Sequence, residues 1–303
     1  MHSIAPYTIR CFDSQSEEKN PRDKYHVLSR IGGIDLYDLL KEFVINLSQQ
    51  YRLDEPSKQA YKTDGIVFDD DKREISCWFL VGYYGMRSDI INVETFQREF
   101  AKGEMNADIM NYFTHFYIPR GVDEGMAFMH KVRSKGKKTL FMDKFLAFFR
   151  SRIDRNLSLR PLSYQKAFDE WKDAQSKEIK VTKFLGHADI QEIAVGLGHV
   201  EQEMIMKPQK KGKSLGTLAS FFKKGSPQNV VVEALSGFGK KVTTVVELDG
   251  RQRTFTVGRS SSSLLCEIEL GDDVEMDEGV PDFESIRAWV KEICAEYNKE
   301  MYS

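Results

Sequence analysis

The sequence predicts an α+β protein of two domains, with mostly antiparallel sheets and flanking helices. Three observations lead to this expectation: many short runs of β-branched and aromatic residues, turn signals between those runs, and only a few segments of helical periodicity. A chain of 303 residues is also long for a single core. We place the division after residue 160, giving an N-terminal α/β domain (1–160) and a C-terminal α+β domain (161–303).

Three segments carry apolar residues at the 3.6-residue spacing of an amphipathic helix. The first follows Asp35, a residue type that favours the N-cap position. A further stretch after Pro161, which contains Trp171, also has a helical pattern. The three predicted helices are Leu36–Tyr51, Lys138–Ile153 and Asp282–Tyr297.

Two hairpins have explicit turn signals between their strands. Asp249-Gly250 is a strong two-residue hairpin signal. The triplet Asp69–Asp71 is interpreted first as a solvated turn, with a metal site as the alternative. The predicted strands are Tyr7–Phe12, Gly65–Phe68, Ile75–Tyr84, Asp89–Val93, Phe113–Ile118, Met126–Val132, Ile179–Leu185, Glu203–Met206, Val242–Leu248 and Thr254–Val257.

The composition is that of a folded protein, with 30% charged and 41% hydrophobic residues. Its four cysteines are scattered and form no CxxC pair, which favours a reducing compartment over a disulfide framework. The N-terminal residues lack the pattern of a signal peptide, and no apolar run is long enough to cross a bilayer. We therefore expect a cytoplasmic protein without direct membrane insertion.

The segment from Lys207 to Lys224 has the most informative charge pattern, and we call it the basic segment. It holds six lysines and no acidic residue, although the whole chain has a net charge of only -2. Such a local cluster indicates an anionic partner, and nucleic acid is the leading one. Nothing in the sequence resembles a base-reading module, so the expected binding to DNA is independent of base sequence.

The expected phosphate contacts come from the basic segment and from two other places. One is the lysine pair after the Gly237–Gly239 loop, and the other is an arginine row near residue 150. The alternative is that these side chains are solvated and offset the acidic run at 267–284. The candidate DNA-binding residues are Lys207, Lys210, Lys211, Lys213, Lys223, Lys224, Lys240, Lys241, Arg150 and Arg152.

An apolar pattern within the basic segment suggests a different role. Leu218, Phe221 and Phe222 resemble the box by which proteins bind a sliding clamp, with Leu215 where that box has glutamine. An adaptor that docks a partner through these residues is therefore one alternative function. The same spacing is also what a short helix needs to pack onto its own domain, which is the favoured interpretation.

Catalytic signatures are weak. Glu178 and Lys180, and likewise Glu170 and Lys172, match the acid-x-Lys half of a metal-dependent nuclease site, which makes a defence nuclease a second alternative. No preceding aspartate can be assigned, and the histidines do not fall at metal-binding spacings. We therefore assign no catalytic or metal-binding residue, expect no cofactor, and favour a protein that is not an enzyme.

The order of elements resembles that of the RexA-type phage-exclusion proteins of lambdoid prophages. It is also similar in outline to the DNA-binding effector of the Kiwa anti-phage system. The matching segments are the helix entry at Gly33–Leu36, ISCWFLVGYYG, FYIPRGVDEG, KKTLFMDKF and MIMKPQKKGKSL. The resemblance implies a homodimeric, cytoplasmic DNA-binding protein that acts with a small membrane partner against phage. It places DNA contacts at Lys207, Lys210, Lys211 and Lys213.

Overall fold

The computed structural model describes residues 2–13, 25–132, 135–162, 171–182, 203–210, 212–237, 241–248, 250–257, 266–271 and 273–301. Within these residues the predicted α+β class is confirmed, because helices cover sheets whose strands pair mostly antiparallel. The chain divides into two compact units. The small unit comprises Ser3–Pro6 and Pro161–Gly271, and the large unit comprises His2, Tyr7–Arg160 and Asp272–Ser303.

The units are not consecutive blocks of sequence. Their main boundary follows Arg160, where the sequence analysis also divides the chain. However, the terminal helix, which that analysis gives to the C-terminal domain, belongs to the large unit. Strand β1 (His2–Phe12) is divided, because Ser3 and Ile4 pair with β16 (Cys266–Glu269) in the small unit, whereas Tyr7 onward belongs to the large unit.

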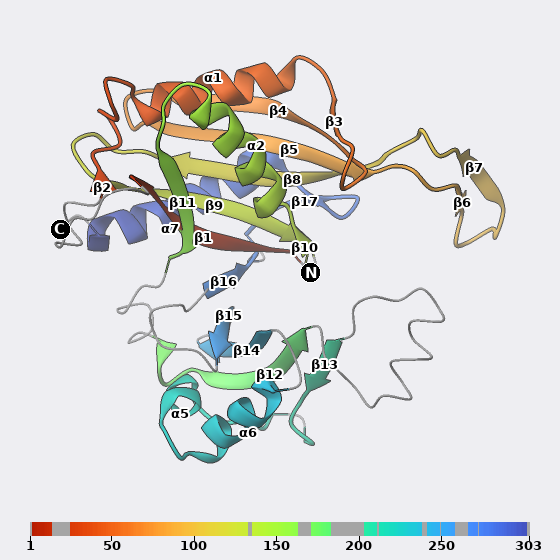
Figure 1. Cartoon of the computed structure of the whole chain (residues 1–303). Coiled ribbons are helices and arrows are strands. Elements are labelled where there is room, and N and C mark those ends of the chain that lie inside the picture. The colour runs from red at the N-terminus through yellow and green to blue at the C-terminus, as the bar shows by residue number, and fades with distance from the viewer. Residues whose placement is uncertain are drawn as a thin grey trace. The chain divides into compact units, whose positions relative to one another are not determined.

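The sheet of the large unit has the strand order β1–β9–β8–β5–β4–β3 (Figure 1). The hairpin predicted around Asp69–Asp71 is confirmed, since β4 pairs antiparallel with β5 on either side of that turn. Both strands begin earlier than the sequence predicts. Short strands β2 (Tyr25–His26) and β11 (Asn156–Pro161) pair with β1, and β10 (Lys135–Gly136) pairs with β9. The other strands are β3 (Arg52–Asp54), β4 (Gln59–Asp69), β5 (Glu74–Tyr83), β8 (Asp108–Tyr117) and β9 (Glu124–Val132).

Helices cover both faces of this sheet. Alternate residues of β5 point to opposite faces, so the Phe79 ring lies 5.3 Å from Phe141 of α2, while Trp78 lies 5.7 Å from Phe283 of α7. Asp35 is the N-cap of α1, as predicted, and its Oδ1 accepts from the Tyr37 amide at 2.9 Å. The helices are α1 (Leu36–Ser48), α2 (Lys138–Arg150) and α7 (Phe283–Met301).

Two small two-stranded sheets complete the large unit. One lies before α7 and consists of β17 (Met276–Asp277) and β18 (Val280–Pro281). The other consists of β6 (Ser88–Ile91) and β7 (Arg98–Lys102), which pair with each other and project beyond the ends of β5 and β8 (Figure 1). The sequence analysis predicts only a turn and one short strand in this projection.

The sheet of the small unit has the order β13–β12–β14–β15–β16 and ends with Ser3 and Ile4 of β1. The hairpin predicted at Gly250 is confirmed, because β14 and β15 pair directly. A core of Ile179, Val181, Val242 and Val257 from the sheet packs with Phe221, Val232 and Leu235 from two helices. The elements are β12 (Gln175–Thr182), β13 (Glu203–Met206), α5 (Leu218–Phe222), α6 (Pro227–Ser236), β14 (Lys241–Leu248) and β15 (Arg251–Val257).

Candidate functional site

The basic segment connects β13 to α6 and is fixed to the small unit by its own backbone. The amide of Leu215 donates to the Ser176 carbonyl at 2.8 Å, and the Ser176 amide donates to Gly216 at the same distance. Further along, the Leu218 amide donates to Ala174 at 3.0 Å and the Ala219 amide to Lys172 at 2.8 Å. These bonds hold the segment against the start of β12, so its side chains are presented from a defined backbone.

The apolar side chains of the segment face the core. Leu218 and Phe221 are fully buried, and Phe222 packs against the same core cluster while remaining partly exposed. The adaptor hypothesis is therefore wrong for Leu218 and Phe221, because these side chains are already occupied within the chain's own small unit. The interpretation as a helix packed onto its own domain is confirmed.

Four lysines of the basic segment remain available to a partner. Lys210, Lys213, Lys223 and Lys224 are exposed. None of the four makes an ion pair with any residue that the structure describes. Lys211 lies outside the described residues. Lysines that no described residue neutralises therefore lie on both sides of the buried α5 side chains, as a phosphate-binding surface requires.

Lys207 has a different environment from the other four. Its Nζ lies 3.0 Å from Glu178 Oε2, and Lys180 Nζ lies 3.0 Å from Oε1 of the same carboxylate. Burial alone would raise the pKa of Glu178, but the two ammonium groups outweigh it and lower the pKa. Lys207 is therefore a partner of Glu178 and is less available to phosphate than the sequence suggests.

This pairing also bears on the nuclease alternative. A metal-dependent site needs several carboxylates around one cation. Among the residues with described positions, no three His, Cys, Asp or Glu side chains group closely enough to hold a metal ion. Glu178 is instead neutralised by Lys180 and Lys207, and Glu170 lies outside the described residues.

The remaining candidates that the structure describes all have partners. Lys241 forms an ion pair with Glu267 at 2.9 Å, and Lys240 lies outside the described residues. Arg150 and Arg152 are in the large unit, where Arg150 donates to Asn156 and Arg152 forms an ion pair with Glu42. The sequence could not show these partners, because most of them are distant along the chain.

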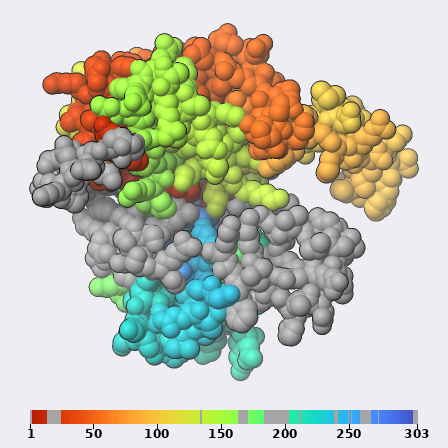
Figure 2. Space-filling view, viewed as in Figure 1, coloured from red at the N-terminus to blue at the C-terminus, as the bar shows by residue number. Residues whose placement is uncertain are grey.

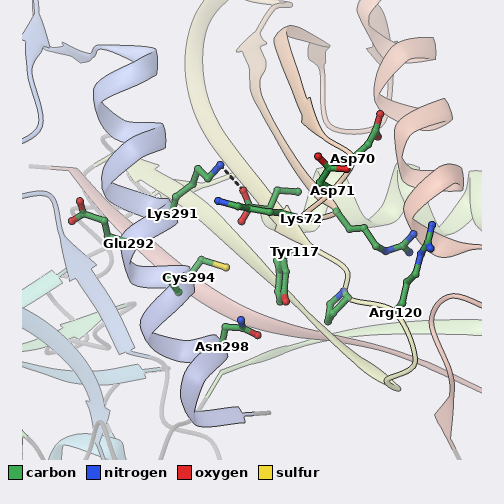
Figure 3. Close-up of a pocket in the computed structure, with 13 residues that line it drawn as sticks. Asp70, Asp71, Lys72, Tyr117, Arg120, Lys291, Glu292, Cys294 and Asn298 are labelled. Atoms are coloured by element: carbon green, nitrogen blue, oxygen red, sulfur yellow. Dashed lines mark ion pairs between the residues drawn. The ribbon is translucent and has the colours of Figure 1, made fainter. Parts of the chain in front are cut away.

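A charged pocket of about 760 Å³ lies in the large unit beside α7 (Figure 3). Lys291, Cys294 and Asn298 line it from successive turns of that helix, while Tyr117 faces them from the end of β8. Lys291 Nζ lies 2.8 Å from Glu74 and 3.2 Å from Asp69. Burial would lower the pKa of Lys291, but these carboxylates outweigh it and raise the pKa.

The charges around this pocket are balanced. Arg73 donates to both oxygens of Asp35, at 3.0 and 2.6 Å, so this carboxylate neutralises its charge. Lys72 and Arg120 have no ion-pair partner in the described part of the chain, and the acids Asp71 and Glu292 are in the same situation. This balance gives no preference for an anionic or a cationic ligand. Burial raises the pKa of the Cys294 thiol, which makes it a poor nucleophile.

The sequence analysis did not anticipate this pocket. It recognises Asp35 as an N-cap and Asp69–Asp71 as a turn, but not the partners Arg73 and Lys291. Lys291 is 222 residues from Asp69 along the chain, and nothing in the local pattern connects the two. Lys291 lies away from the stripe of Ile286, Val290 and Ile293 on the predicted final helix, so no local signal could have pointed here.

The comparisons with known proteins give no family. No protein-family model matches the chain, and no curated protein matches it at a significant level. None of the helices in the described ranges combines the length and apolarity that a membrane span requires.

Proposed function

We propose that this chain is a cytoplasmic DNA-binding protein that contacts the phosphate backbone through the basic segment and does not read base sequence. One observation supports the proposal above the others: Lys210, Lys213, Lys223 and Lys224 are exposed and form no ion pair with any described residue, on a segment whose Leu218 and Phe221 are buried. Lysines held in this way bind phosphate through charge and counterion release, which requires no base contact.

The biological context of the proposal comes from the order of elements along the chain. That order resembles RexA-type proteins, so we place the DNA binding within phage exclusion. The same resemblance implies a homodimer that acts with a small membrane partner. A membrane-protein gene beside this one would support that context independently of any binding measurement.

The salt dependence of DNA affinity tests the phosphate contacts. Four contacts predict that log affinity falls against log salt concentration with a slope of roughly -3.6. Replacing two of the four lysines, Lys210→Gln with Lys213→Gln, should reduce that slope by about 2 and weaken binding at least tenfold at about 50 mM salt. Fluorescence anisotropy with two duplexes of unrelated sequence measures both quantities, and we expect the duplexes to bind equally.

A matched control separates these contacts from a change in net charge. Lys58 and Lys72 are exposed lysines of the large unit, and replacing both by glutamine removes the same charge. That variant should bind DNA as the unaltered protein does. Equal affinity for the variant of Lys210 and Lys213 would show that the basic segment does not contact DNA.

A further inference from the structure

The projection formed by β6 and β7 exposes more apolar side chain than any other described segment of the chain. We call residues Met86–Met105 the arm. Val93 and Phe96 at its tip are 77% and 78% exposed, and Met86 and Met105 at its base are each 76% exposed. Ile90, Ile91 and Phe100 on its strands are also exposed. Figure 2 shows the arm standing clear of the surface around it.

Hydrogen bonds give the arm a defined conformation. At its tip, the Asn92 side chain accepts from the amides of Glu94 and Thr95, at 2.9 and 3.1 Å, and donates to Glu99 at 2.9 Å. At its base, the Gly85 amide donates to Glu104 at 2.6 Å and Lys102 donates to the Tyr83 carbonyl at 3.0 Å. The exposed apolar residues are therefore held in a defined arrangement.

Such a ribbon is incomplete by itself. In the described part of the chain, β6 and β7 pair only with each other, so each has an edge of unpaired backbone groups. A two-stranded ribbon is marginally stable in water, and exposed apolar patches rimmed by polar residues mark contact surfaces. These properties predict that the arm binds another strand or another apolar surface.

The charges of the arm favour one class of occupant. It carries the bases Arg87, Arg98 and Lys102 and the acids Asp89, Glu94, Glu99 and Glu104. Glu94 stands between the two most exposed apolar residues, at the end that an anionic lipid surface or nucleic acid would meet first. A surface that carries both positive and negative charges can pair its acids with the bases of a second copy, and its bases with the acids of that copy.

The size of the arm also fits this occupant. A stable interface uses about 20–30 residues from each partner, and the arm supplies twenty. When two identical ribbons meet around a two-fold axis, every contact between one residue and another occurs twice, once in each direction. We propose that the arm is the dimer contact of this protein, in which two copies pair ribbon against ribbon. This assignment does not depend on DNA binding.

The test compares the self-association of the full chain with that of an arm variant. Phe96→Asn suits the positive φ of that residue, 57°, and Phe100→Thr keeps a residue that favours strands. Both side chains are exposed, so we expect the fold to be retained. Sedimentation velocity over a range of concentrations should give a dimer for the unaltered chain and at least a tenfold larger dimer Kd for the double variant.

A matched control tests whether any loss of exposed apolar surface has this effect. Leu53 and Val230 are 51% and 55% exposed and lie outside the arm. Their replacement by serine should leave the dimer Kd unchanged. A monomer at every concentration would overturn the proposal, as would a dimer that the arm variant does not weaken. Binding of the unaltered chain, but not the arm variant, to phosphatidylcholine and phosphatidylserine vesicles without dimerisation would assign the arm to a membrane instead.

The two proposals can fail separately. The variant of Lys210 and Lys213 should lose DNA affinity in the anisotropy measurement and still sediment as a dimer. The arm variant should sediment as a monomer under conditions where the lysine variant does not. If only one of these results is obtained, only the corresponding surface assignment stands.

Discussion

Phe221 and Phe222 are adjacent in the sequence but have different environments in the small unit. Phe221 is fully buried in the core cluster, whereas Phe222 packs against it from a partly exposed position. A pair of aromatic residues on a short helix therefore contributes one core side chain and one at the edge of the core. The lysines that follow them owe their position to this packing.

The first prediction at this scale concerns that difference. Phe221→Ala removes a fully buried ring and should lower the free energy of unfolding by about 3–5 kcal/mol. Phe222→Ala should have a clearly smaller effect, because part of its ring already contacts water. Urea denaturation followed by circular dichroism measures both variants. Equal losses would show that the two rings are equally buried in solution.

His115 supplies a second prediction, through its buried ring. The ring is inaccessible, its Nδ1 lies 2.8 Å from Ser76 Oγ, and its Nε2 has no hydrogen-bond partner among the residues that the structure describes. Burial, aided by the charges of Lys291 and Arg287, lowers the pKa of His115 to about 3. Burial likewise lowers the pKa of His130 to about 3. Both histidines are therefore neutral in the folded protein at neutral pH.

The sign of the pH dependence follows from these pKa values. In the unfolded chain a histidine takes up a proton near pH 6.5, whereas the folded protein does so only near pH 3. The contribution of the neutral ring to the free energy of unfolding is therefore complete above pH 6.5. It is lost as the pH falls from 6.5 toward 3. The loss is about 1.4 kcal/mol per pH unit for each histidine.

Removing one of these titrating groups should reduce that dependence. His115→Asn should be less stable overall, and its free energy of unfolding should fall less between about pH 6 and pH 5 than that of the unaltered chain. His130→Asn should reduce the slope by a similar amount. Urea denaturation at several pH values measures the slopes, and an unchanged slope in both variants would contradict the buried neutral state.

At the scale of elements, α7 gives the large unit its second covered face. Its Phe283 lies 5.7 Å from both Trp78 and Phe113, and its Lys291 neutralises Glu74 and Asp69. A sheet with one uncovered apolar face is a site of aggregation. The helix is therefore a structural part of a unit whose other helices, α1 and α2, lie before Arg160.

A truncation tests this role. A chain that ends at Gly271 should expose Trp78 and Phe113, leave Glu74 buried without its cation, and lose cooperative unfolding of the large unit. Binding of a hydrophobic dye and a broadened thermal transition are the expected readouts. Supplying residues 272–303 as a separate peptide should restore part of the transition. A truncated chain with an unchanged melting curve would contradict the role of α7.

The elements also show which features could be predicted from the sequence. The β4–β5 and β14–β15 hairpins were predicted because their turns have local signals, and α1 because Asp35 precedes a clear apolar period. Helix α6 was missed, although Ser226 caps it through the Asn229 amide and Pro227 occupies its first turn. That N-terminal signature was present in the sequence. The stretch predicted as a helix after Pro161 falls mostly outside the described residues.

The candidate site was predictable in its charge and not in its pairing. The lysine cluster and its buried apolar side chains follow from local sequence. The partners of Lys207, Lys241 and Arg152 are Glu178, Glu267 and Glu42, and strand order and helix packing bring these partners to them. The sequence alone does not show that these residues lie close to each other in the fold. The arm could not be predicted for a related reason, since only the fold shows that its apolar residues are exposed.

At the scale of the whole molecule, the small net charge conceals a separation of positive and negative charge along the chain. The chain is nearly neutral at -2, yet the basic segment has no acid and the run at 267–284 has nine. Glu267 of that run is neutralised by Lys241, which lies outside the basic segment. The exposed lysines of the basic segment are the part that is not cancelled among the described residues, and the proposed DNA contact uses that part.

The path of the chain through the two units has a consequence for synthesis. The small unit needs β16 at residues 266–269 to pair with Ser3 and Ile4, and the large unit needs α7 at residues 283–301. Neither unit can be completed while the ribosome is still within the first 260 residues, although domains commonly fold in order of emergence. At about 5–20 residues per second, the first strand waits roughly 15–60 s for its partners. During that interval the unpaired strand edges and apolar surface of the nascent chain are prone to aggregation.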